Sequence, residues 1–217
     1  MVRIGIDYSL NSPSICIDNG EELSFVSFFN AEGLEWKREK PLKKFYYHNI
    51  LSEIIEVVPY NRNTDKTSYQ TEQVSKMRDA MYMSNMITER ITRYMWGECV
   101  VSLEGFAFQS QGAAFIDLIM FNSFLRKDII RMFGYDRLMI VAPTSAKKLA
   151  GKGNANKEYM IQAFIDNKLG DELLVKNPLY KYVTENELDY KNIKPIDDLI
   201  DAYWIMRSQT MSFSEYK

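Results

Sequence analysis

Cysteine and histidine are both scarce in this sequence, which has two cysteines and one histidine among 217 residues. Cys16 and Cys99 provide neither a disulfide framework nor a metal-ligand spacing, a pattern typical of a reducing cytoplasm. The single histidine, His48, argues against Ser-His-Asp catalysis unless it lies buried beside a serine. We therefore exclude a disulfide-stapled secreted domain and expect a cytoplasmic protein.

Long hydrophobic runs are missing as well. No segment approaches the roughly 18 uninterrupted apolar residues that span a bilayer, and the first predicted strand begins at Val2, which leaves no room for a signal sequence. We expect no membrane association. Because the formal net charge is −2, the whole chain does not attract polyanions, and a nucleic-acid site would depend on local basic patches.

The sequence is long enough for one complete hydrophobic core. Of its 217 residues, 46% are hydrophobic, and a chain of this size favours one domain over two. Residues 31–69 mix charged, proline and aromatic residues irregularly. We predict a single domain over residues 1–217 with an insertion at about 31–69, in which residues 50–58 are compatible with a helix or a strand.

Hydrophobic periodicity predicts strands followed by alternating helices and strands. Three short β-rich runs, at residues 2–8, 12–18 and 23–29, are separated by turn sequences and predict an antiparallel meander. The pattern then predicts a helix over 72–95, a strand over 99–106, a helix over 113–133, a strand over 137–143, and helices over 156–169 and 195–208. The first of these helices is predicted to bury a stripe of Val74, Met77, Met81, Ile87, Ile91 and Met95.

Two clusters of basic residues interrupt the pattern. The first contains Lys37, Arg38, Lys40, Lys43 and Lys44, and the second contains Lys147, Lys148, Lys152 and Lys157. A charge run is commonly a solvated surface, and this interpretation stays open for the first cluster. In the second cluster, Gly151 and Gly153 bracket Lys152, which allows close approach to a phosphate, although the spacing is not that of a P-loop.

Four acidic residues fall where they can converge. Asp7 follows the first strand, Glu104 follows a later apolar strand, and Asp198 and Asp201 share one face of the last helix because they are three residues apart. Singly, each is compatible with a turn, a strand end or a helix start. Together they would repel one another unless a cation offsets their charge, and oxygen-only ligands favour Mg²⁺ or Mn²⁺. Two such ions can support phosphodiester cleavage.

The same residues lie in motifs that resemble a known family. The segments IGIDYSLNSPSICI, VSLEGFAF, AKKLAGKGNANKEYMIQAF and DDLIDAYWI are similar, in order and spacing, to motifs of the RuvC-type Holliday junction resolvases of the ribonuclease H-like superfamily. The resemblance implies an α/β fold whose mixed sheet begins with three antiparallel strands and has helices on both faces. It also implies a homodimer that makes paired nicks in branched DNA, above all four-way junctions, during recombination and repair.

The resemblance implies a role for each matching residue. Asp7 would be the first-strand metal ligand, Glu104 the bridging ligand, and Asp198 and Asp201 the helical ligands. Asp197 is an alternative to Asp198, which the spacing to Asp201 favours. The cofactor would be Mg²⁺, with Mn²⁺ able to substitute, and the nucleophile a metal-activated water. The residues expected to contact DNA are Lys148, Lys152, Lys157, Phe106 and Phe108.

The helix predicted over Ala113–Phe133 carries more apolar residues than one buried face needs. Its first three turns contain Phe115, Ile116, Leu118, Ile119, Met120, Phe121, Phe124 and Leu125. The surplus surface requires a second cover, which is either a partner subunit or residues 31–69. Because the corresponding helix of the resembled family lies at the subunit interface, we favour a homodimer centred on Phe115–Leu125.

Other functions stay open at the level of sequence. A transposase or an RNA–DNA hybrid nuclease of the same superfamily would keep all four acids. A sugar-kinase-like or actin-like ATPase also begins with a strand, an acid and a hairpin, but it needs a second phosphate-binding domain for which 217 residues leave little room. A catalytically silent DNA-binding protein would not need the four acids together.

Overall fold

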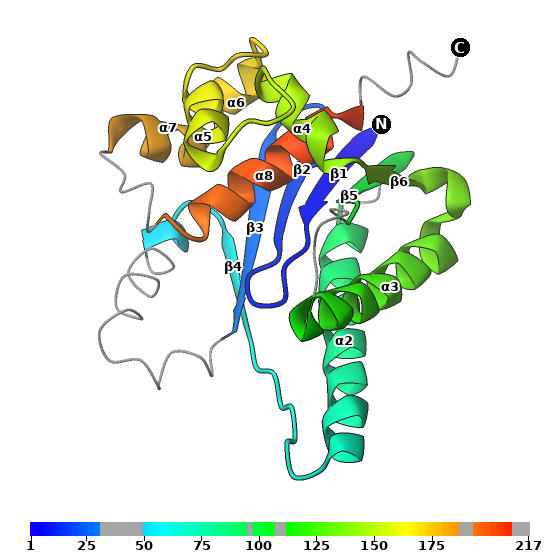
Figure 1. Ribbon diagram of the computed structural model, residues 1–217. Helices are drawn as coiled ribbons and strands as arrows, with labels where there is room; N and C mark the ends of the chain where they lie inside the picture. The colour runs from blue at the N-terminus through cyan, green and yellow to red at the C-terminus, as the bar shows by residue number, and fades with distance from the viewer. Residues whose placement is uncertain (31–49, 95–96, 107–111, 187–192, 210–217) are drawn as a thin grey trace.

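The computed structural model describes residues 1–30, 50–94, 97–106, 112–186 and 193–209. A six-stranded sheet with the order β4-β3-β2-β1-β5-β6 forms the middle layer, and helices lie on both of its faces (Figure 1). The strands are β1 (Val2–Asp7), β2 (Ser14–Asp18), β3 (Leu23–Asn30), β4 (Glu56–Tyr60), β5 (Cys99–Glu104) and β6 (Leu138–Val141). The helices are α2 (Tyr69–Thr92), α3 (Ala113–Phe133), α4 (Pro143–Ala150), α5 (Lys157–Ile165), α6 (Glu172–Lys176), α7 (Pro178–Glu185) and α8 (Ile196–Arg207), with a 3-10 turn at Tyr135–Arg137. The predicted mixed α/β architecture is confirmed.

The first three strands form the predicted antiparallel meander. β1 pairs with β2 with Gly5 opposite Cys16, and β2 pairs with β3 with Cys16 opposite Phe25. Local hydrogen bonding builds the turn between β2 and β3, because the Asp18 carboxylate accepts from the backbone N–H of Gly20 at 2.8 Å. Gly20 has a φ of +93°, a conformation that favours glycine.

The remaining strands run parallel to their neighbours. β4 pairs with β3, β5 with β1, and β6 with β5, all in the parallel sense. As a result the carboxyl ends of β1 and β5 lie side by side, with Ile6 opposite Leu103. β4 belongs to the segment predicted as an insertion and forms one edge of the sheet. Residues 31–49 lie outside the described residues, so an insertion there stays a prediction.

Two hydrophobic layers pack on the sheet. Ile4 and Ile6 of β1 are fully buried against α2 and α3, where Phe121 and Leu125 complete the layer. The opposite layer is built around α8 and includes Cys16 as a buried free thiol, as predicted. Because successive side chains of a strand point to opposite faces of the sheet, a strand such as β3 contributes side chains to both hydrophobic layers.

Helix α8 lies directly on β1. At Gly5 a Cβ atom would lie 2.2 Å from the carbonyl oxygen of Ala202 and 2.4 Å from the backbone nitrogen of Met206, so the helix backbone occupies the space of a side chain. At the carboxyl-terminal end of α8, next to Met206, Arg207 donates to Asp18 at 2.8 Å and also to Asp171. Although α8 is buried on nearly all sides, no helix in the described part of the chain is long and apolar enough to cross a membrane.

The predicted buried stripe of α2 is only partly correct. Ile87 and Ile91 are fully buried, whereas Val74, Met77 and Met81 are exposed by 60%, 46% and 49%. The amino-terminal half of α2 instead turns Ser75, Asp79, Ala80 and Met83 inward. In this half of the helix, the buried face contacts backbone N–H groups of the segment after β4 as well as the apolar core. Polar and small residues therefore occupy positions where Val74, Met77 and Met81 were expected. Met95 lies outside the described residues.

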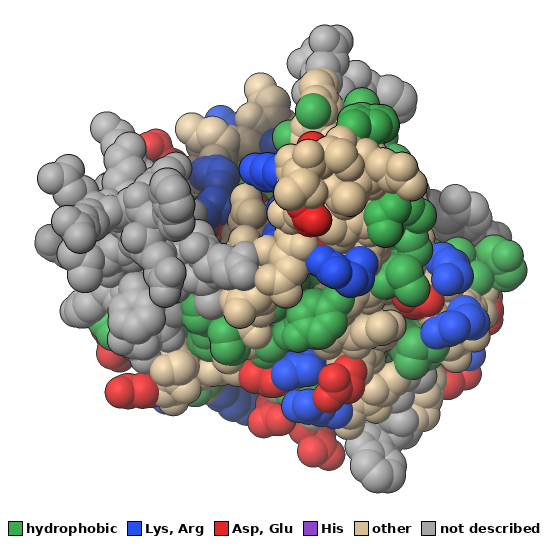
Figure 2. Space-filling model, turned by 90° about the horizontal axis from the view of Figure 1, so that it is seen from below, with side chains coloured by type: hydrophobic (Ala, Val, Ile, Leu, Met, Phe, Trp, Pro, Cys, Tyr) green, Lys and Arg blue, Asp and Glu red, His purple; other side chains and the backbone are tan. Residues whose placement is uncertain are grey.

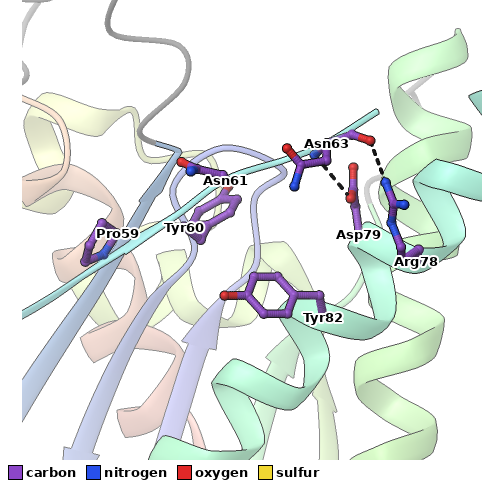
Figure 3. A pocket seen from close by; sticks show the side chains of 7 residues that line it. All are labelled: Pro59, Tyr60, Asn61, Asn63, Arg78, Asp79 and Tyr82. Atoms are coloured by element: carbon purple, nitrogen blue, oxygen red, sulfur yellow. Dashed lines mark hydrogen bonds between the residues drawn. The ribbon is translucent and has the colours of Figure 1, made fainter. Parts of the chain in front are cut away.

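The chain segment that follows β4 supplies those polar partners. The Asp79 carboxylate accepts from the backbone N–H of Asn63 at 3.3 Å and from the Thr64 hydroxyl at 2.8 Å. Arg78 donates to the carbonyl oxygen of Asn63 at 2.7 Å, and Tyr82 lies across the adjoining pocket from Tyr60 (Figure 3). These bonds fix the path of the segment along α2.

Helix α3 buries one stripe and exposes another. Phe121, Leu125 and Ile129 are almost completely buried in the layer shared with α2, and Leu118, Met120 and Phe124 are partly buried against it. Ile116 and Ile119 remain exposed by 67% and 37%. Exposed apolar side chains therefore lie in the first two turns of α3, with Met132 exposed by 42% near its other end.

The contact at Gly5 makes a prediction about stability. We expect Gly5→Ala to lower the free energy of unfolding by about 3 kcal/mol or more, because the added methyl group collides with the backbone of α8. Gly105→Ala is the matched control, since its added Cβ would have no neighbour closer than 3.4 Å. Chemical denaturation followed by circular dichroism measures both, and equal stabilities of the two variants would contradict the packing described.

Candidate active site

Three elements bring the predicted acids to one edge of the sheet. Asp7 ends β1 and Glu104 ends β5, and these strands are adjacent and parallel. Helix α8 crosses β1 at Gly5 and carries Asp198 and Asp201 on one face, three residues apart. Asp198 is 3% exposed, while Asp7, Glu104 and Asp201 are partly exposed. The four acids are therefore held by the core rather than by surface loops.

The acids perturb one another strongly. Burial raises the pKa of Asp7 well above its ordinary value, and the nearby charges of Asp198, Asp201 and Glu104 raise it further. The pKa of Asp201 is raised to about 7, first by burial and then by Asp198 and Glu104. Burial also raises the pKa of Glu104, which the charge of Lys147 partly offsets. The charges of Asp198 and Glu104 thus raise the pKa values of both Asp7 and Asp201, which indicates that the four carboxylates lie close together.

Two lysines pair with the acids of α8. Lys194 donates to both carboxylate oxygens of Asp198, at 2.7 Å and 2.8 Å, and the Ser12 hydroxyl donates to Asp198 at 2.7 Å. Lys157 pairs instead with Asp197. After burial, Asp198 and Asp201 contribute most to the raised pKa of Asp7. This arrangement favours Asp198 over Asp197 as the acid that faces Asp7.

The donor set is suited to a hard divalent cation. All four candidate ligands are carboxylates, which are the ligands that Mg²⁺ and Mn²⁺ prefer, and a cation would relieve the repulsion that raises their pKa values. Within the described ranges, no three His, Cys, Asp or Glu side chains already surround a common metal position. Asp198 is engaged by Lys194 and Ser12. The residues fit a metal pair chemically, but their side chains would have to reorient to hold it.

The predicted DNA-contacting lysines occupy different environments. Lys148, Lys152 and Lys157 are all exposed. The ammonium of Lys152 lies 4.7 Å from the centre of the Tyr159 ring, and the side chain of Lys148 lies beside Gly153. Lys157 faces the acids through Asp197. The segment from the end of α4 to the start of α5 therefore presents Lys148 and Lys152 to solvent and directs Lys157 toward the candidate site.

The predicted aromatic contacts are described only in part. Phe106 follows β5, and its ring lies 4.7 Å from the guanidinium carbon of Arg126 and 5.7 Å from the Phe115 ring in an edge-to-face arrangement. Phe108, His48 and the first basic cluster lie outside the described residues. Figure 2 views the end of the molecule toward which β1 runs, where basic side chains are spread among hydrophobic ones.

Sequence reasoning missed Lys194 and Ser12. Lys194 lies four residues before Asp198, just ahead of α8, and this spacing, which brings side chains together on a helix, is the signal that could have identified it. Ser12 is separated from Asp198 by 186 positions, so no local pattern signals the contact. The sequence placed Lys147 in a basic cluster, but it did not indicate that the charge of Lys147 lowers the pKa of Glu104.

The sheet order, the initial antiparallel meander and the helices on both faces define a ribonuclease H-like fold. Among solved structures the chain is similar to RuvC of Thermus thermophilus, with 14% sequence identity, a TM-score of 0.51, and alignment of 99% of this chain with 96% of that chain. The chain therefore has a RuvC-type fold, as the motifs predicted.

Two further solved structures are similar at lower scores. Thermus thermophilus RuvC in complex with a Holliday junction substrate has 12% identity and a TM-score of 0.46, covering 99% of this chain and 96% of that chain. The yeast mitochondrial Holliday junction resolvase Ydc2 has 13% identity and a TM-score of 0.45, covering 98% and 83%. No protein-family model and no curated protein sequence matches the chain.

The raised pKa values predict how stability depends on pH without a divalent metal. Because the folded chain retains protons that the unfolded chain releases, the contribution of these acids to stability is greatest below pH 3.8, the ordinary pKa of Asp, and is lost as the pH rises through the Asp201 pKa of about 7. We expect Asp201→Asn to reduce this loss and to raise the melting temperature near neutral pH by about 3 °C or more. The measurement is thermal unfolding in EDTA across this range, in which acid unfolding at the lowest pH is fitted separately.

Asp136→Asn provides the control, because the Asp136 side chain is 79% exposed and lies in the turn after α3. It should leave the dependence on pH as it is in the unmodified chain. Identical pH profiles for Asp201→Asn and the unmodified chain would contradict the mutual repulsion of the acids.

Proposed function

We propose that the protein is a metal-dependent endonuclease that cleaves branched DNA, with the four-way Holliday junction as its main substrate. The observation that carries this proposal is the meeting of Asp7, Glu104, Asp198 and Asp201 at one edge of a RuvC-type fold. A purely structural role would not require four mutually repelling carboxylates to be buried together. The biological setting that fits this activity is DNA recombination and repair.

The four carboxylates would hold Mg²⁺, or Mn²⁺ in its place. A bound pair of these ions supplies activation of the attacking water and stabilisation of the leaving oxygen. Asp7 and Glu104 provide rigid positions because strands β1 and β5 fix their backbone, and α8 positions Asp198 and Asp201 across from them. The positions of these ligands would therefore not depend on loop closure.

The substrate class follows from two features near the acids. Exposed Lys148, near the end of α4, and Lys152, in the glycine-containing loop after it, lie where phosphates can approach, and Lys157 at the start of α5 pairs with Asp197 beside the acids. Phe106 lies just beyond Glu104, where an aromatic ring can stack on an unpaired base. The solved RuvC structure with a Holliday junction substrate belongs to a protein similar to this chain. Together these features favour DNA with an accessible branch point.

Cleavage assays provide the direct test. We expect nicking of a labelled four-way junction in Mg²⁺ or Mn²⁺, and much weaker nicking of a linear duplex of the same sequence. Asp7→Asn and Glu104→Gln should reduce the rate by about 10³-fold or more while junction binding is retained or improved, because a negative charge near phosphate is removed. Full activity of either variant would contradict the assignment of the acids.

The assay also separates the alternatives. Three-way, flap and RNA–DNA hybrid substrates belong in the same series, and cleavage of the hybrid alone would instead support an RNA–DNA hybrid nuclease. Binding of all junctions without any cleavage would support a catalytically silent DNA-binding protein. Asp136→Asn, which removes an exposed acid in the turn after α3, is the matched control and should cleave at the unmodified rate.

We also propose that the protein acts as a homodimer through the amino-terminal half of α3. Ile116 and Ile119 expose apolar surface there, next to the partly buried side chains of Leu118 and Met120. A two-fold contact on this surface would place two sets of acids on one assembly, so that each could reach one of two symmetric strands. This arrangement would explain paired nicks.

The dimer has its own test. We expect Ile116→Glu to give a folded monomer that no longer makes coordinated paired cuts, because a charge would be buried at the two-fold contact. Met132→Glu is the matched control, since Met132 is exposed by 42% near the opposite end of the same helix. Analytical ultracentrifugation at micromolar concentration reads out the association. A monomeric unmodified protein, with and without junction DNA, would refute the proposed dimer.

A further inference from the structure

Among the residues that the structure describes, Lys194 makes the closest cationic contact to any of the four acids. Its ammonium donates to both oxygens of Asp198, at 2.7 Å and 2.8 Å. The Asp198 side chain is only 5% exposed, whereas that of Lys194 is 38% exposed. The ion pair therefore has one partner fixed inside the protein and one partner that reaches in from the surface.

Lys194 also acts on a second acid of the cluster. Its charge lowers the pKa of Asp7, against the combined effect of burial and the other acids. Lys157, the second lysine at α8, pairs with Asp197 instead. Lys194 thus offsets charge at Asp198, which it contacts directly, and at Asp7.

A carboxylate that accepts two hydrogen bonds from an ammonium and a third from a hydroxyl has little free capacity for a metal ion. Asp198 is in that condition, because Ser12 provides the third bond at 2.7 Å. A divalent ion and an ammonium at the same oxygens would also repel each other over a few ångströms. The flexible four-carbon stem of lysine allows its ammonium to move outward into water.

We propose that Lys194 is an internal counterion of Asp198 that a divalent metal ion must displace before Asp198 can serve as a ligand. This inference rests on the proposed function, in which Asp198 binds metal. Lys194 is accordingly a positioning residue for the metal site: it stabilises the cluster when no metal is bound and weakens metal binding by competition. The competition acts at Asp198, so it depends on that carboxylate.

Metal binding by the full chain, without DNA, tests this directly. We expect Lys194→Gln to bind Mn²⁺ about tenfold more tightly than the unmodified chain, as measured by calorimetry or by the electron paramagnetic resonance signal of free Mn²⁺. Lys76→Gln is the matched control. It removes the same charge from a lysine that pairs with Glu72 and Asp117, on α2 and α3, and it should leave Mn²⁺ affinity unchanged.

Two further variants keep the inference falsifiable if Lys194→Gln folds poorly. Lys194→Arg retains the charge and can hold Asp198 through two parallel bonds, so its Mn²⁺ affinity should be no tighter than that of the unmodified chain. In an Asp198→Asn background, adding Lys194→Gln should no longer tighten Mn²⁺ binding. Persistent tightening in that background would overturn the assignment of the competition to Asp198.

The outcomes distinguish this inference from the proposed function. If the unmodified chain cleaves junctions and binds Mn²⁺ while Lys194→Gln binds Mn²⁺ equally or more weakly, Lys194 assists metal binding and the inference is wrong. If the unmodified chain binds no Mn²⁺ and cleaves no DNA, the inference fails together with the proposed function. Tighter binding by Lys194→Gln alone among the lysine variants would support both.

Discussion

The contact of α8 with β1 at Gly5 is the constraint on which the candidate site depends. No side chain fits between the strand and the helix there, since the carbonyl oxygen of Ala202 occupies the position of a Cβ atom. The close approach places the amino-terminal turns of α8 over the end of β1. Directly after Met206, Arg207 joins the carboxyl-terminal end of the helix to Asp18 and Asp171, so both contacts fix the carboxyl-terminal half of α8. The separation of Asp201 from Asp7 is therefore set by main-chain packing.

This rigidity has an electrostatic cost. Burial, followed by the charge of neighbouring acids, raises the pKa values of Asp7, Asp198 and Asp201, which lowers stability near neutral pH. Lys194 and Lys157 offset part of the charge, each paired with a different acid of α8. Carboxylates that repel one another are common at sites for divalent ions, because the bound ion offsets their negative charge. The local lysines and the metal then act as alternative sources of the same positive charge.

Much of the fold could be predicted because its signals are local. The meander of β1 to β3 follows from short β-rich runs and turn residues, and Glu104 follows from an apolar strand that ends in an acid. The spacing of Asp198 and Asp201 placed both on one helix face. Each of these features depends on residues within a few positions of one another.

The predictions from sequence failed where contacts between distant parts of the chain determine which side chains are buried or which residues form a strand. Helical spacing identified an apolar stripe on α2, but Val74 and Met77 face solvent because the core and the segment after β4 lie against the other side of the helix. The short run at 50–58 was ambiguous until pairing with β3 made part of it a strand. The bond between Ser12 and Asp198 joins segments 186 positions apart and has no sequence pattern.

The central claim is that Asp7, Glu104, Asp198 and Asp201 hold divalent ions. Anomalous scattering from crystals of the full chain grown with Mn²⁺ tests it most directly. We expect manganese peaks at about 2.2 Å from carboxylate oxygens of Asp7 and of at least one of the two α8 acids. Manganese bound elsewhere on the protein, with these four carboxylates making no contact to it, would contradict the claim.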